Sequence, residues 1–85
     1  MAINRSEHKL IQSYVLEKFF VSTAYRRAST VEEMWFYETI VWDWDSATHK
    51  RGKIVTMEDS GGLAETAIDS HFEICRNLAK LSVNK

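Results

Sequence analysis

The spacing of apolar residues near the end of the chain predicts an amphipathic helix. Between Leu63 and about Leu81, small and apolar residues recur at the 3.6-residue period of a helix. They are Ala64, Ala67, Ile68, His71, Cys75 and Leu78, with charged residues on the opposite face. The preceding Asp59–Gly62 segment predicts a turn into this helix, with Ser60 or Gly62 as the N-cap and Glu65 in the first turn.

Segments rich in β-branched and aromatic residues predict strands before this helix. The strongest covers Met34 to Asp45, a shorter one covers Lys53 to Glu58, and a third covers Phe19 to Arg27. The connections between them are short, which favours antiparallel neighbours. The sequence therefore predicts one α+β domain over residues 1–85. Its core is a three-stranded antiparallel meander, with the strongest strand in the middle, packed by the C-terminal helix.

Residues 4–17 allow two interpretations. Asn4 and Glu7 have the spacing of a capping box, and the apolar residues that follow have helical spacing. This pattern favours a short N-terminal helix at about residues 5–13. The alternative is that residues 14–20 extend the first strand.

The segment VWDWDSATHKRG at 41–52 predicts a β-hairpin with a four-residue loop at 46–49. The predicted cross-strand pairs are Asp45–Lys50, Trp44–Arg51, Asp43–Gly52, Trp42–Lys53 and Val41–Ile54. This register pairs opposite charges and places cations beside the Trp rings, which stabilises a hairpin without any ligand.

The same register divides the central strand into two faces. Met34, Phe36, Ile40, Trp42 and Trp44 share one face with Val55 and Met57. This face is the more apolar, so we expect it to meet the helix. The other face still carries Trp35, Tyr37 and Val41, which predicts either a partner surface or a face covered by the N-terminal segment.

Length and composition limit the classes of function. At 85 residues, folding buries only about 60% of the surface that the unfolded chain exposes. One cysteine cannot form an internal disulfide, so association with a partner or with itself would help stability. The net charge of −1 gives no bulk argument for nucleic acid. The chain shows no apolar run of about 20 residues and no signal-peptide segment at its start. Together with the free thiol, this predicts a cytoplasmic protein without a membrane partner.

Several residues could carry chemistry, and each also has a structural interpretation. Asp43 and Asp45 are too few carboxylates for a good metal site. His71 and Cys75 lie one helical turn apart, but we expect His71 in the core, in contact with Glu38. The Ser60–Gly62 segment reads as a helix entry rather than a phosphate site. The sequence thus predicts no catalytic residue, no metal ion and no cofactor.

Three short pieces resemble small proteins encoded by bacteriophages and some bacteria. They are FVST at 20–23, YETIVW at 37–42, and Ala67 with His71 in a terminal helix. The resemblance implies a strand–strand–strand–helix order and a phage or accessory-gene context. It implies no catalytic activity.

The leading hypothesis is a non-enzymatic interaction domain that docks its aromatic strand surface or hairpin tip on a protein, including a second copy of itself. Such a domain would suit a phage-type accessory or host-modulating role. The alternative is nucleic-acid or nucleotide binding through the Trp residues and their cations, although Arg26 and Arg27 are expected at the far end of the sheet from the hairpin. A third hypothesis is an enzyme centred on His71. The candidate binding residues are Trp35, Tyr37, Trp42, Trp44, His49, Lys50, Arg51 and Lys53.

Overall fold

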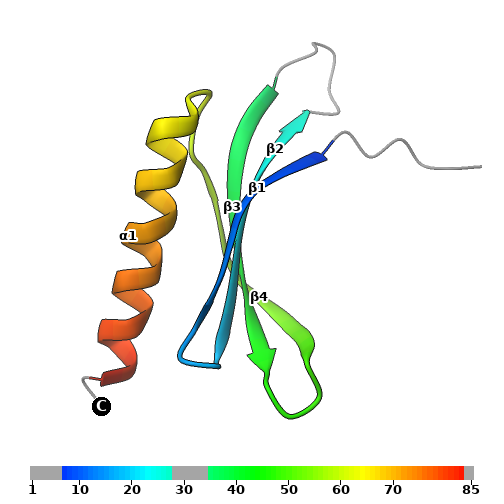
Figure 1. Ribbon diagram of the computed structural model, residues 1–85, viewed down its shortest axis with the longest axis vertical. Coiled ribbons are helices and arrows are strands. Elements are labelled where there is room, and N and C mark those ends of the chain that lie inside the picture. Colours follow the sequence, from blue (N-terminus) through cyan, green and yellow to red (C-terminus); the bar gives the residue numbers. More distant parts are fainter. Residues whose placement is uncertain (1–6, 28–34, 84–85) are drawn as a thin grey trace, which may run out of the picture.

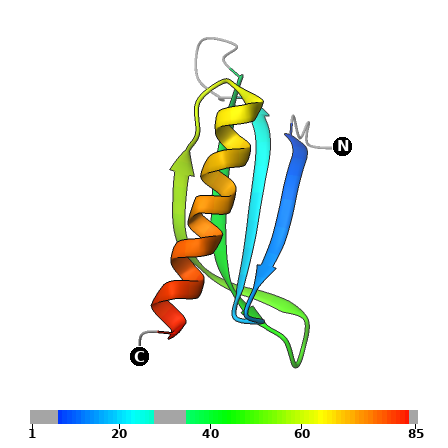
Figure 2. The same cartoon turned by 60° about the vertical axis from the view of Figure 1, so that its left-hand side comes forward.

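The computed structural model describes residues 7–27 and 35–83. Its elements are β1 (Glu7–Val15), β2 (Phe19–Arg27), β3 (Trp35–Asp45), β4 (Lys50–Asp59) and α1 (Ala64–Val83). The strands form one antiparallel sheet in the order β1-β2-β3-β4, and α1 lies along one of its faces (Figure 1 and Figure 2). The predicted α+β class, with an antiparallel sheet and a C-terminal helix, is confirmed. The predicted number of strands is wrong, because the sheet has four.

The fourth strand is β1, and it replaces the helix expected at residues 5–13. It pairs with β2 from Glu7 opposite Arg26 to Val15 opposite Phe19. The register shifts by one residue between Lys9 and Ile11, so a bulge interrupts the alternation of side chains within β1. That interruption removes the two-residue period from the sequence and leaves a spacing that imitates a helix. The predicted cap residue Asn4 lies outside the described residues.

The helix packs on the face opposite to the one predicted. Val15, Val21, Val41 and Leu78 form the buried core, and Phe19, Ile74, Cys75 and Ala79 pack against it. Val41 belongs to the face that was expected to be free, whereas Trp42 and Trp44 point away from α1. The reason is size: Ala67 has no exposed surface, and its small side chain lets the helix approach strands whose facing residues are also small. The average apolarity of a sheet face, on which the prediction relied, does not measure how closely a helix can pack on it.

A tight turn joins β1 to β2 at one end of the sheet. Between β1 and β2, Leu16 and Glu17 have φ of 53° and 57°, and the Lys18 N–H donates to the Val15 carbonyl at 2.9 Å. Three residues, 16–18, connect the strands, and two left-handed residues inside such a hydrogen-bonded turn match the right-handed twist of the flanking strands. The usual Asn-Gly signal is missing here, which is why the turn was not predicted.

The hairpin of β3 and β4 was predicted in part. Its loop at 46–49 and the pairs Asp45–Lys50 and Trp44–Arg51 are confirmed. Trp42, however, lies opposite Ile54 instead of Lys53, because irregularities between Val41 and Trp44 put extra residues into β4. The same shift places Val41 opposite Thr56 instead of Ile54. Gly52 still lies beside Asp43, next to an irregularity in the pairing. A Cβ added to Gly52 would lie 3.2 Å from the Asp43 Cβ.

Two main-chain hydrogen bonds join the β4–α1 connection to β3. The Ser60 N–H donates to the Tyr37 carbonyl at 2.7 Å, and the Tyr37 N–H donates to the Gly61 carbonyl at 2.6 Å. Gly61 has φ of 79°, a conformation that favours glycine. The helix begins at Ala64, and the Leu63 carbonyl accepts its first hydrogen bond, from Ala67. The predicted N-caps, Ser60 and Gly62, therefore lie upstream of the position that caps the helix.

Candidate functional site

The sheet face turned away from α1, called the open face below, carries a cluster of aromatic rings. Tyr14 of β1 lies 5.0 Å from Phe20 of β2, measured between ring centroids, and 4.9 Å from Trp44 of β3. Phe20 lies 5.6 Å from Trp42 in a stacked arrangement. These separations are favourable for aromatic pairs. Phe20 is buried by its neighbours, whereas the Tyr14 side chain is 60% exposed, so the cluster is firmly packed and still presents a ring to solvent.

Cationic side chains lie beside these rings. The Arg51 guanidinium carbon sits 4.6 Å from the Trp42 ring centroid, where the sequence predicted Lys53 as the neighbouring cation. A groove of about 260 Å³ follows the open face. Its lining comes from all four strands and the β3–β4 loop: Lys9, Gln12, Tyr14, Phe20, Ser22, Trp42, Trp44, His49 and Arg51. Among the described residues that line this groove, none is acidic.

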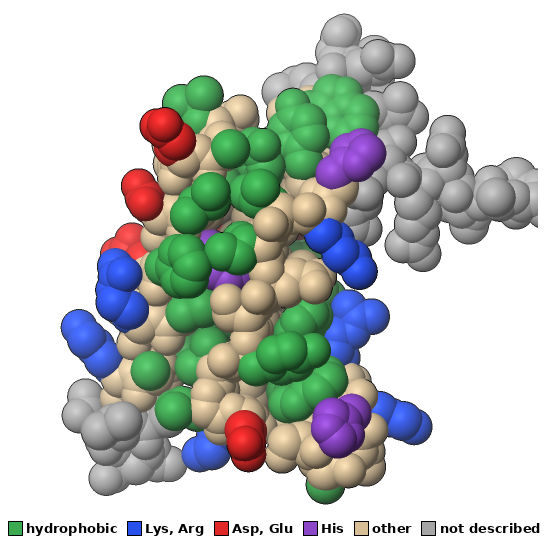
Figure 3. All heavy atoms as spheres, viewed as in Figure 1, with side chains coloured by type: hydrophobic (Ala, Val, Ile, Leu, Met, Phe, Trp, Pro, Cys, Tyr) green, Lys and Arg blue, Asp and Glu red, His purple; other side chains and the backbone are tan. Residues whose placement is uncertain are grey.

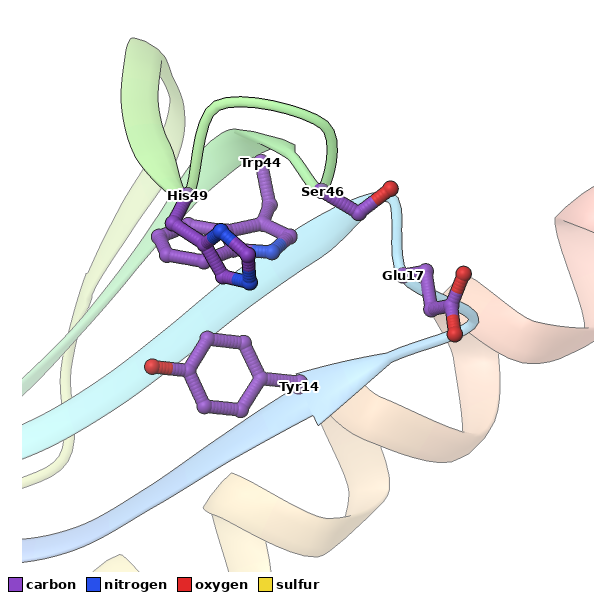
Figure 4. A pocket seen from close by; sticks show the side chains of 5 residues that line it. All are labelled: Tyr14, Glu17, Trp44, Ser46 and His49. Atoms are coloured by element: carbon purple, nitrogen blue, oxygen red, sulfur yellow. The ribbon is translucent and has the colours of Figure 1, made fainter.

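A second hollow of about 590 Å³ adjoins the groove, where the two hairpins meet. We call it the end pocket, and it is lined by Tyr14, Glu17, Trp44, Ser46 and His49. Figure 4 shows the rings of Tyr14, Trp44 and His49 gathered on one side, with Glu17 and Ser46 on the other. The end pocket therefore has an aromatic part and an oxygen-bearing part.

Main-chain and side-chain hydrogen bonds hold both rims of the end pocket in place. The Trp44 N–H donates to the Lys18 carbonyl at 2.8 Å, which ties the β1–β2 turn to β3. The Asp45 carboxylate accepts from the Ala47 N–H at 3.0 Å, and the His49 N–H donates to the Asp45 carbonyl at 2.7 Å. The Thr48 hydroxyl, followed by the Ala47 N–H, lowers the pKa of Asp45 by stabilising its charged form.

The other titratable cluster lies in the core, under α1. His71 has no exposed surface; its Nδ1 is hydrogen-bonded to the Thr23 hydroxyl at 2.8 Å and its Nε2 to the Ser13 hydroxyl at 2.9 Å. The Thr23 hydroxyl also meets that of Thr39 at 2.6 Å. Burial lowers the pKa of His71, so the ring is held neutral between hydroxyl partners.

The predicted contact between Glu38 and His71 is wrong. Glu38 points to the open face, where it forms an ion pair with Arg26. Burial raises the pKa of the Cys75 thiol, and a hydrogen bond from Ser13 opposes part of that shift. A thiol with a raised pKa is a weaker nucleophile at neutral pH. The side chains around His71 thus have a structural role, because they satisfy one another's hydrogen bonds inside the core.

The predicted binding residues fall into three groups. Trp42, Trp44, His49 and Arg51 come together on the open face, as described above. Trp35 and Tyr37 lie at the far end of the other face, where the Tyr25 ring is 5.0 Å and 4.6 Å from them. Lys50 and Lys53 are exposed on β4, outside the groove and the end pocket.

The prediction missed several residues that line the groove and the end pocket: Lys9, Gln12, Tyr14, Glu17, Phe20, Ser22 and Ser46. Of these, Lys9 and Gln12 fall within residues 5–13, which were predicted as a short helix. The signal that could have found Tyr14 was the alternative in which residues 14–20 extend the first strand. Arg26 and Arg27 pair with Phe36 and Trp35 at the opposite end of the sheet, as predicted.

Within residues 7–27 and 35–83, no group of three or more His, Cys, Asp or Glu side chains could hold a metal ion. No helix in that part of the chain is long and apolar enough to cross a membrane. Comparison of the chain with protein-family models, curated proteins and solved structures found no match.

Proposed function

We propose that this chain is a non-enzymatic domain that binds single-stranded nucleic acid on its open face. The observation that carries the proposal is the groove, in which exposed aromatic rings and cations lie side by side on a rigid sheet. Proteins that bind single strands without strong sequence preference combine these two elements. The bases stack on aromatic rings, and the cations follow the phosphates.

Each part of the groove has a role in this proposal. Tyr14 and Trp44 offer ring surface for bases, and such stacking contributes about 1–3 kcal/mol per base. Lys9 and Arg51 reach the phosphates, and each phosphate neutralised steepens the salt dependence of binding by a slope of about 0.7. Arg51 also packs on Trp42, so its guanidinium is oriented before the ligand arrives.

The low net charge of the chain does not oppose this proposal, because the described residues that line the groove include Lys9 and Arg51 and no acidic residue. The helix α1, the layer behind the sheet, exposes side chains of both signs: Glu65, Asp69, Glu73, Arg76 and Lys80. Lys and Arg side chains follow the right-hand edge in Figure 3, on the side of the open face. The local field at a surface depends on nearby charges more than on the total, since salt screens charges beyond about 10 Å.

The test is binding of a fluorescent oligonucleotide of about eight nucleotides, measured by anisotropy, to wild type and variants. We expect Trp44→Ala and Arg51→Ala each to weaken binding about tenfold, which corresponds to about 1.4 kcal/mol. Phe72→Ala and Lys80→Ala remove a ring and a cation from α1 and serve as matched controls. Unchanged affinity in both groove variants, with circular dichroism of the folded state retained, would contradict the proposal.

A second candidate function is contact with a protein, including a second copy of the chain. It is favoured by Ile54, Val55 and Met57, which are about half exposed on the edge strand β4. The face with Trp35, Tyr37 and Val41 no longer supports this candidate, because Val41 is fully buried beneath the helix. Analytical ultracentrifugation distinguishes the two functions. A dimer that Val55→Lys converts to monomer, without loss of oligonucleotide binding, would assign β4 to self-association.

A further inference from the structure

The turns of two hairpins form the end pocket. Among the described residues, the non-glycine positions with positive φ are Leu16, Glu17 and His49, at 53°, 57° and 58°. Glu17 and His49 both line the end pocket. These residues belong to the turns of the two hairpins, where left-handed conformations are common. The two turns thus bring the Glu17 and His49 side chains to the same hollow.

The end pocket also has an unusual chemical composition for a site that meets an anion. Glu17 is an acceptor with a negative charge, beside a groove lined by Lys9, His49 and Arg51. A phosphate at Glu17 would be repelled. A neutral hydroxyl group would instead donate a strong, charge-assisted hydrogen bond to this carboxylate.

The arrangement of the two parts matches the shape of a nucleoside. In Figure 4 the rings of Tyr14, Trp44 and His49 are separated from Glu17 and Ser46 across the pocket. A flat base fits the aromatic part, and its sugar then reaches the oxygen-bearing part. Within a single strand, the hydroxyl available to Glu17 is the ribose 2′-OH, which distinguishes RNA from DNA.

We propose that the end pocket holds one ribonucleotide of single-stranded RNA, with the base against Tyr14 and Trp44 and the 2′-OH donating to Glu17. This inference rests on the proposed function and adds the class of nucleic acid. Deoxyribose offers no such donor, so DNA would bind without this charge-assisted hydrogen bond. Repulsion between Glu17 and phosphates acts on both polymers, so the hydrogen bond to the 2′-OH carries the preference for RNA.

The experiment compares ribose and deoxyribose oligonucleotides of the same uracil sequence, about eight nucleotides long, in anisotropy titrations. We expect wild type to bind the ribo form about tenfold more tightly, the effect of one hydrogen bond to a charged group. Glu17→Gly should bring the two affinities within about twofold of each other. Glycine suits the positive φ at this position, so the turn is retained.

Leu16→Gly is the matched control, because Leu16 has the same backbone conformation and does not line the end pocket. It should keep the preference for RNA. Equal affinity of wild type for both oligonucleotides would overturn the inference and leave the proposed function standing. Equal loss of preference in both glycine variants would overturn it as well. Failure of wild type to bind either oligonucleotide would instead refute the proposed function itself.

Discussion

Replacing Thr23 by Val should destabilise the fold more than its small change in shape suggests. The Thr23 hydroxyl is hydrogen-bonded to His71 Nδ1 at 2.8 Å and to the Thr39 hydroxyl at 2.6 Å. All three residues have no exposed surface. Valine keeps the branched shape and the strand propensity, so the variant isolates the loss of the hydroxyl.

The expected cost follows from the number of groups left without a partner. An unsatisfied buried polar group costs about 1–3 kcal/mol, and two such groups predict a loss of about 2–6 kcal/mol. For 85 residues the free energy of unfolding is expected to be about 4–13 kcal/mol. A loss at the lower end, about 2 kcal/mol, would already lower Tm by about 8–16 °C in a domain this small.

The assay is urea unfolding followed by circular dichroism, with Thr56→Val as the control. Thr56 lies opposite Val41 on the same face of the sheet, partly buried and outside the hydrogen-bonded cluster. The variant combining Thr23→Val with Thr39→Val should cost less than the sum of the two single changes, because both act on one shared bond. If Thr23→Val changes the free energy of unfolding by less than about 0.5 kcal/mol, the reasoning from buried hydroxyls is wrong.

Two further predictions concern the core and the entry to α1. Burial lowers the pKa of His71 below its ordinary 6.5, so the unfolded chain takes up a proton that the folded chain refuses. The contribution of His71 to the free energy of unfolding should therefore be constant above about pH 6.5 and decrease as the pH drops below that value. Urea titrations at about pH 7.5 and 5.5 measure this change. Equal free energies of unfolding at the two pH values would contradict the assignment of a buried, neutral His71. Gly61→Ala should destabilise by about 1 kcal/mol because φ is positive there, whereas Gly62→Ala, with open space and no such φ, should be neutral or slightly stabilising. Equal effects of the two substitutions in thermal unfolding would show that backbone conformation is not the cause.

The parts of the fold that were predicted correctly depend on residues close together in the chain. The helix from Ala64 shows its period over five turns, and the hairpin loop at 46–49 brings Trp44 opposite Arg51 within a few residues. A cation beside Trp42 was also expected, but the predicted cation was Lys53, whereas Arg51 lies over that ring. In each case the interacting residues are fixed by local geometry, and no distant segment can change them.

The candidate site was predicted in part. Trp42, Trp44, His49 and Arg51 are on one hairpin and could be found together. Tyr14 could not be joined to them from the sequence, because it lies on a strand whose alternation is broken by a bulge. Trp35 and Tyr37 were expected on a face left for a partner or for the N-terminal segment, because the packing face of the sheet was chosen by average apolarity.

The sequence by itself determined the α+β class, the terminal helix, the β3–β4 hairpin and the pairing of cations with Trp rings, because each arises from a local period or a short loop. The tertiary structure alone decided which face α1 covers, and with it which residues remain open to a ligand. That choice depends on how closely two surfaces fit: Ala67 and the neutral His71 match small residues of the sheet, whereas Trp42 and Trp44 do not fit there. Shape complementarity between distant segments leaves no periodic signal in the chain.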